Sequence, residues 1–113
     1  MLFRSVLSGD IMCPKNFIFS IESKGRANFN FWDMLNQDTV HLEINDWISQ
    51  AENDARIVGK EPLVYVKVNN RKPFVIFPID LIEDYFYGIR YGDYFIMRFD
   101  YFLEFEDDFF FKE

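Results

Sequence analysis

The segment Asn16-Phe17-Ile18-Phe19-Ser20-Ile21-Glu22-Ser23-Lys24 alternates between apolar and other side chains over residues 17–22, with Ile18 as the exception. This alternation predicts a β-strand, bounded upstream by Pro14. Side chains two positions apart on a strand lie on the same face of the sheet. A carboxylate and an ammonium group would then stand side by side on one face. We expect Phe17, Phe19 and Ile21 on one face, and Ser20, Glu22 and Lys24 on the other.

A second carboxylate, Asp10, lies upstream in Gly9-Asp10-Ile11 and would reach Glu22 if the chain folds back as a hairpin before the strand. Two converging carboxylates form a hard-oxygen site suited to Mg²⁺. The adjacent Lys24 would hold an attacking water or neutralise charge on a phosphate. The alternative is an ordinary Glu/Lys ion pair on a surface strand, since a Glu-x-Lys triplet is common by chance.

Composition predicts one domain over residues 1–113, with 50% hydrophobic and 20% aromatic residues to fill its core. No apolar run approaches the roughly 20 residues of a membrane span, and residues 1–7 are too short for a signal peptide. A single cysteine, Cys13, excludes an internal disulfide and favours a reducing, intracellular (cytoplasmic) compartment. Cys13 and His41 stand apart in the sequence, which argues against a zinc site.

Charge is distributed unevenly along the chain. The net charge of −7 argues against a simple nucleic-acid binder. Residues 1–30 and 60–80 are nevertheless basic, with +2 each, whereas residues 31–59 carry −5 and residues 81–113 carry −6. If the two basic segments are adjacent in space, a phosphate could approach there despite the overall sign.

The main helix is predicted over about residues 44–58. The apolar residues in this segment step by three or four positions, as on one face of an amphipathic helix, and Trp47 widens this stripe. Asn45 or Asp46 would cap the start, and Gly59 would end the helix. Gln50 lies off the stripe and could reach a site at the sheet edge. The stripe residues are Ile44, Ile48, Ala51, Ala55 and Val58.

Two strands follow, over residues 63–68 and 74–77, joined by a hairpin loop at 69–72. Both are almost wholly apolar, which predicts burial on two faces; Lys67 is the exception, either as a snorkelling side chain or as a cation near a phosphate. A short helix is expected near residues 80–87, another strand at 94–98, and a strand or closing segment at 102–105. Trp32 and Met34, in the irregular or helical piece at 29–35, are expected to pack on the sheet. The fold class is α/β, with a mixed sheet covered by one helical crossover.

The order of these motifs resembles small PD-(D/E)xK nucleases of the archaeal Holliday junction resolvase type and their phage relatives. In that group a Gly-Asp turn precedes a strand ending in Glu-x-Lys, and a helix then leads to a strand with a lysine. Here Gly9-Asp10, Glu22-Ser23-Lys24, the helix near 44–58, Gly59-Lys60-Glu61-Pro62 and Lys67 follow in the same order. The resemblance covers roughly residues 8–80 and implies a restriction-endonuclease-like core.

The resemblance implies Mg²⁺-dependent (or Mn²⁺-dependent) hydrolysis of phosphodiester bonds in DNA, with branched DNA as the expected substrate. Asp10 and Glu22 would be metal ligands, aided by the Ser23 carbonyl, and Lys24 would be the catalytic lysine. We expect a homodimer, because such nucleases cut paired strands with paired sites and because the run Phe109-Phe110-Phe111 needs burial. The expected DNA contacts are Lys24, Arg26, Lys67, Arg71 and Lys72.

One departure keeps other functions open. Resolvases of this type begin with a helix that presents a further glutamate, and residues 1–9 hold no acid. The chain would then be a non-cleaving relative or would take the missing acid from another subunit. The alternative function is a non-catalytic, phage-type acidic protein that mimics DNA or inhibits a protein partner, although a solvated surface is the simpler explanation of its acids. Its binding face would comprise Asp100, Glu104, Glu106, Asp107 and Asp108.

Overall fold

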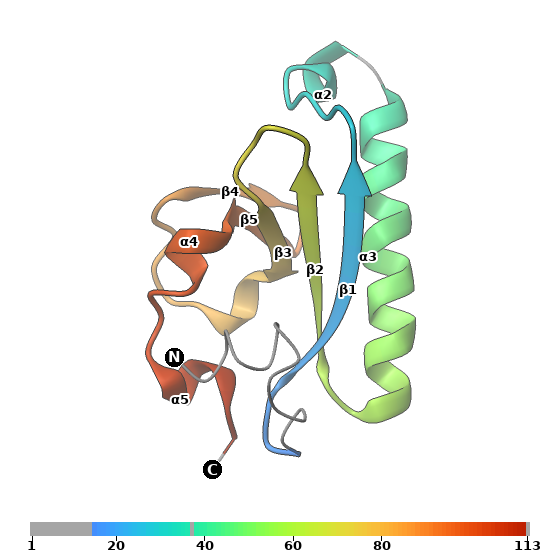
Figure 1. The fold of residues 1–113 in the computed structure, drawn as a ribbon. Helices are drawn as coiled ribbons and strands as arrows, with labels where there is room; N and C mark the ends of the chain where they lie inside the picture. The colour runs from blue at the N-terminus through green and yellow to red at the C-terminus, as the bar shows by residue number, and fades with distance from the viewer. Residues whose placement is uncertain (1–14, 37, 113) are drawn as a thin grey trace.

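The computed structural model describes residues 15–36 and 38–112. Their central element is a five-stranded sheet in the order β1-β2-β3-β5-β4 (Figure 1). β1 and β2 are parallel, and the remaining neighbours are antiparallel, which confirms the predicted mixed sheet. The strands are β1 (Phe19–Arg26), β2 (Glu61–Val68), β3 (Phe74–Pro78), β4 (Gly88–Tyr91) and β5 (Tyr94–Arg98).

Helix α3 (Asp38–Val58) connects β1 to β2 and covers one face of the sheet (Figure 1). It begins one to two turns earlier than expected, because the buried Val40 extends the apolar stripe. Asn45 and Asp46 therefore lie inside the helix, and the prediction that they cap its start was wrong. Gly59 ends the helix as predicted, at φ +67°. The Lys60 N–H donates to the Ala55 carbonyl (2.9 Å), closing a Schellman motif.

The sheet is buried on both faces, as the apolar sequences of β2 and β3 predicted. Under α3, the stripe residues Ile44, Ile48 and Ala51 pack with Trp47 against alternate residues of the strands. The opposite face is rich in phenylalanine and is covered by α4 (Phe99–Phe102) and α5 (Asp107–Phe110). Among the described residues, no helix is long and apolar enough to cross a membrane.

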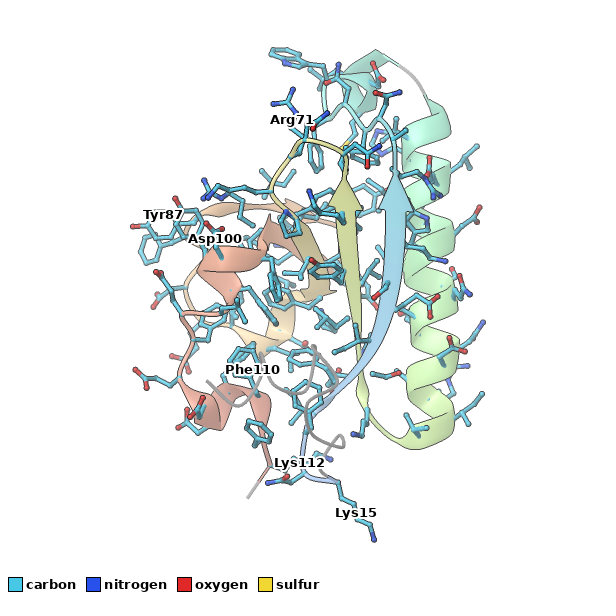
Figure 2. The ribbon with its side chains drawn as sticks, viewed as in Figure 1. Lys15, Arg71, Tyr87, Asp100, Phe110 and Lys112 are labelled. Atoms are coloured by element: carbon cyan, nitrogen blue, oxygen red, sulfur yellow. The ribbon has the colours of Figure 1, made fainter. Side chains whose placement is uncertain are left out.

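The carboxyl-terminal phenylalanine run is buried within its own chain. Phe110 has no exposed surface, and Phe109 and Phe111 pack partly buried around the same core. The Ile18 N–H donates to the Phe110 carbonyl (2.8 Å), so this end of the chain is tied to the segment before β1 (Figure 2). The expectation that the run needs a partner subunit for its burial was therefore wrong.

The segment after β3 differs from the prediction. The short helix expected near 80–87 is a single 3₁₀ turn, η1 (Ile79–Leu81), and residues 88–91 form the edge strand β4, which we did not predict. A Cβ on Gly88 would lie 2.4 Å from the Ile96 carbonyl oxygen, so only glycine permits this close strand approach. Residues 102–105 are not a strand, since α4 ends at Phe102 and a turn follows.

The piece between β1 and α3 contains the short helix α2 (Asp33–Asn36). Met34 packs against the core below α3, as expected. Trp32 does not pack on the sheet, because 71% of its surface is exposed.

Candidate functional site

The polar face of β1 lies toward α3. Glu22, Lys24 and Arg26 pair in register with Val64, Val66 and Val68 of β2. These three valines belong to the core under α3, and neighbouring residues of paired strands share a face. The predicted alternation of β1 is thus confirmed: Phe19 lies in the opposite core, and Ile21 packs against it.

Glu22 and Lys24 form the centre of the candidate site. The Lys24 Nζ lies 3.4 Å from Glu22 Oε1, and only 20% and 22% of the two side chains are exposed. Lys24 also donates a hydrogen bond of 2.7 Å to the Gln50 side-chain oxygen on α3. Gln50 therefore holds the lysine from the helix, a contact that its position off the apolar stripe allowed but did not specify. The site presents a fixed ammonium group beside a carboxylate, still within reach of solvent.

The Ser23 carbonyl of β1 is the second predicted metal ligand, beside the Glu22 carboxylate. In a parallel pair, alternate residues of a strand bond to a given neighbour. Glu61 donates to the Ile18 carbonyl (2.7 Å) and Asn69 to the Arg26 carbonyl (3.0 Å), so even-numbered residues of β1 bond to β2. The Ser23 carbonyl therefore points to the other side of β1, where no described strand pairs with it.

Arg26 continues the same face but is held by its own chain. Its guanidinium group pairs with Glu43 of α3 and lies 5.0 Å from the centre of the Trp47 ring. The ion pair and the aromatic contact both occupy this cation. We therefore expect Arg26 to order the β1–α3 layer more than to attract phosphate.

The other predicted DNA contacts lie elsewhere. Lys67 alternates with Val66 and Val68, so it lies on the face of the sheet opposite Lys24. Its ammonium group donates to the carbonyls of Val68 (3.0 Å) and Arg71 and so closes the hairpin. Arg71 and Lys72 are exposed in the β2–β3 loop at one end of the sheet (Figure 2). β1 and β2, which belong to the two basic segments, are adjacent, but Lys24 and Lys67 lie on opposite faces of the sheet.

The predicted partner carboxylate, Asp10, lies outside the described residues, and so does its expected approach to Glu22. Within residues 15–36 and 38–112, no group of three or more His, Cys, Asp or Glu side chains could hold a metal ion. Of the metal ligands that the sequence predicted, Glu22 and Ser23 lie within the described residues.

Comparison with protein families gives one match. Residues 3–109 match the family described as "Phage putative PDDEXK endonuclease". The chain belongs to this family. No curated protein matches it, and no solved structure matches it.

Membership of this PDDEXK endonuclease family agrees with the donor set on β1. The family model spans Glu22-Ser23-Lys24, helix α3 and all five strands, so it covers the whole candidate site. A carboxylate and a main-chain carbonyl are the oxygen ligands that Mg²⁺ and Mn²⁺ prefer. Glu22 and the Ser23 carbonyl are therefore, in kind, the oxygen donors that a divalent metal takes.

Proposed function

We propose that this chain is a metal-dependent DNA endonuclease that hydrolyses phosphodiester bonds. The observation that carries the proposal is the half-buried Glu22–Lys24 pair, held by Gln50, in a chain of a PDDEXK endonuclease family. An ordinary surface ion pair is worth little and needs no helix residue to position it. Here the ammonium group is held beside a carboxylate, which suits a metal-assisted site: the carboxylate would hold the metal, and the ammonium group would meet the phosphate.

In the proposed reaction, Glu22 and the Ser23 carbonyl would hold Mg²⁺ or Mn²⁺ together with Asp10. The bound metal would polarise the phosphate and lower the pKa of a bound water. Lys24 contacts a non-bridging phosphate oxygen and offsets the negative charge that grows there in the transition state. Gln50 acts through Lys24, because its hydrogen bond sets the direction of the ammonium group.

A cleavage assay tests this function. The purified protein is incubated with a four-way junction, a flapped duplex and a plain duplex, each in Mg²⁺, Mn²⁺, Ca²⁺ or a chelator. We expect nicking in Mg²⁺ or Mn²⁺ and none in Ca²⁺ or chelator, because the chemistry needs a small hard cation. The resolvase-like subtype predicts faster cleavage of the junction or flap than of the plain duplex.

A metal titration provides an independent measurement. Calorimetry should detect Mn²⁺ binding to the wild-type protein and weaker binding to Glu22→Gln, which removes the charge but keeps the shape. No cleavage in any metal, with equal titrations for both proteins, would count against the endonuclease. The alternative function, a non-catalytic protein that binds a partner through its acidic carboxyl-terminal surface, would then be favoured.

We further propose that the chain acts as a homodimer on branched DNA, since cutting two strands requires two sites. The buried phenylalanine run no longer supports this association. Light scattering is measured at micromolar concentration for the free protein and for its complex with a four-way junction. The complex, at least, should contain a protein mass of twice 13.7 kDa. A single chain per junction would contradict the dimer.

A further inference from the structure

A cavity of about 870 Å³ opens at the end of the sheet where β1 and β2 finish. Its walls come from the segment between β1 and α2 and from the β2–β3 hairpin, which lie side by side in Figure 1. The volume lies within the range of small-ligand sites in proteins. Aromatic rings, amides and cations line it together, and none of these groups belongs to the Glu22–Lys24 site.

Aromatic side chains form the apolar part of the cavity. Phe29, Phe31 and Phe74 pack with ring centres 5.0 to 5.6 Å apart. Phe74 is buried, whereas Phe31 is 38% exposed and Trp32 is 71% exposed. Two large rings thus remain open to solvent in a concave site, an arrangement that a folded chain maintains at a cost unless a ligand covers it.

The exposed Trp32 stands on a fixed backbone. The backbone N–H of Trp32 donates to the Asn30 side-chain oxygen (2.9 Å), and the backbone carbonyl of Trp32 accepts from the Leu35 N–H (3.0 Å). The Asp33 N–H also donates to the Asn30 carbonyl (3.0 Å). This turn orders the backbone that carries the indole before any ligand arrives. A preorganised aromatic surface lowers the entropic cost of stacking a planar ligand.

Three cations line the cavity, and they are not equivalent. Asp100 pairs with Arg98 and lies 3.7 Å from Lys72. The hydrogen bond from Arg98 lowers the pKa of Asp100 to about 2, so this carboxylate stays charged at neutral pH and occupies both cations. Arg71 is exposed, and within the described part of the chain no ion pair involves it. An exposed guanidinium group without an ion-pair partner among the described residues can bind a phosphate through two hydrogen bonds.

Amide groups complete the lining. Asn28, Asn30 and Asn69 are all exposed at the cavity, although the Asn30 side-chain oxygen already accepts from the Trp32 backbone N–H. Amide side chains offer both a donor and an acceptor, the pattern that the edges of unpaired bases recognise. An apolar ligand would leave these groups and Arg71 unused, and a simple anion would leave the rings uncovered. A nucleotide uses the rings, the amides and the cation at once.

We infer that this cavity binds an unpaired nucleotide of a single DNA strand, with its base against Trp32 and Phe31 and its phosphate at Arg71. The lining begins at Ala27, three residues after Lys24, or about 10 Å along β1 at ~3.3 Å per residue. A strand held in the cavity would therefore run close to the candidate site. The consequence of this binding for cleavage rests on the proposed function. If the chain is an endonuclease, its substrate would contain a single-stranded segment, as a flap or an opened junction does.

The test measures binding in a chelator, so that no hydrolysis occurs. A labelled single strand of about 12 nucleotides and the same sequence as a blunt duplex are titrated by fluorescence anisotropy, while tryptophan emission is recorded. Trp47 is 3% exposed, so a ligand at the surface quenches mainly Trp32. We expect the single strand to bind more tightly than the duplex and to quench the emission.

Variants locate the binding. Trp32→Ala should weaken single-strand binding by about 10- to 100-fold, in line with the loss of one stacked base. Arg71→Ala should weaken it and reduce the slope of log affinity against log salt by roughly 1. The matched controls are Phe86→Ala, another exposed aromatic, and Arg56→Ala, another exposed cation; both lie outside the cavity lining and should bind as wild type.

The outcomes separate this inference from the proposed function. Wild-type affinity in Trp32→Ala, equal affinity for duplex, or tighter binding of the matching RNA strand would each overturn the inference, whether or not the protein cleaves DNA. Tight single-strand binding that depends on Trp32 and Arg71 supports it, even if no metal produces cleavage. Circular dichroism on each variant confirms that the fold is retained, as expected for substitutions at exposed positions.

Discussion

Replacing Lys24 with alanine is expected to reduce DNA cleavage by at least about 10²–10³-fold, the usual effect of removing one group that stabilises charge in a transition state. Glu22→Gln should cause a comparable loss, because it would remove the charge of a proposed metal ligand. The two losses should not add in the double variant, since both residues act on the same phosphate and water. Rates of nicking under single-turnover conditions measure the effect.

Stability should change little in these variants. The Glu22–Lys24 pair is partly exposed, and such pairs contribute about 0–1 kcal/mol to stability.

Lys112→Ala is the matched control for Lys24→Ala in the cleavage assay. Lys112 is an exposed lysine outside the candidate site, and in Figure 2 it lies at the opposite end of the molecule from Arg71. Gln50→Ala should slow cleavage less than Lys24→Ala, and Gln50→Glu should restore part of the loss by keeping an acceptor for Lys24. Full activity in Lys24→Ala would contradict the assigned role.

The largest expected effect on stability is that of Phe110→Ala. Phe110 is fully buried, with its ring centre 5.3 Å from that of Phe102 and 6.4 Å from that of Phe19. Truncating a buried phenylalanine costs about 3–5 kcal/mol through lost transfer energy and the cavity left behind. Small domains have only ~5–15 kcal/mol of stability in total, so the variant should be close to unfolding at room temperature. Denaturant titration measures the loss.

The control for this prediction is Phe86→Ala, because Phe86 is 68% exposed and its loss should change stability by no more than about 0.5 kcal/mol. Unfolding should also be measured at two protein concentrations. If Phe110 were an anchor in a partner subunit, the loss would depend on concentration. A loss below about 1 kcal/mol, or one that appears only at high concentration, would contradict burial within the chain.

Local periodicity in the sequence determined much of the fold. The apolar stripe of α3 repeats within one segment, and so do the buried runs of β2 and β3, because each element sorts its own residues toward the core. The same argument placed Glu22 and Lys24 together on one face of β1, since a strand alternates whatever surrounds it. The positive φ of Gly59 after the helix also follows from local geometry alone.

Only the tertiary structure decided which segments meet. β4 has four residues, too few for its alternation to predict a strand, and its pairing with β5 is what forms it. The position of Phe110 depends on a segment more than 90 residues away, and the contact of Lys24 with Gln50 depends on where α3 crosses β1. The cavity at Trp32 and Arg71 joins two loops some 40 residues apart. Local periodicity determines which side of its helix or strand a residue lies on, because the backbone repeat is the same in any fold. The contacts of that side chain depend on long-range pairing of segments, which no local pattern contains.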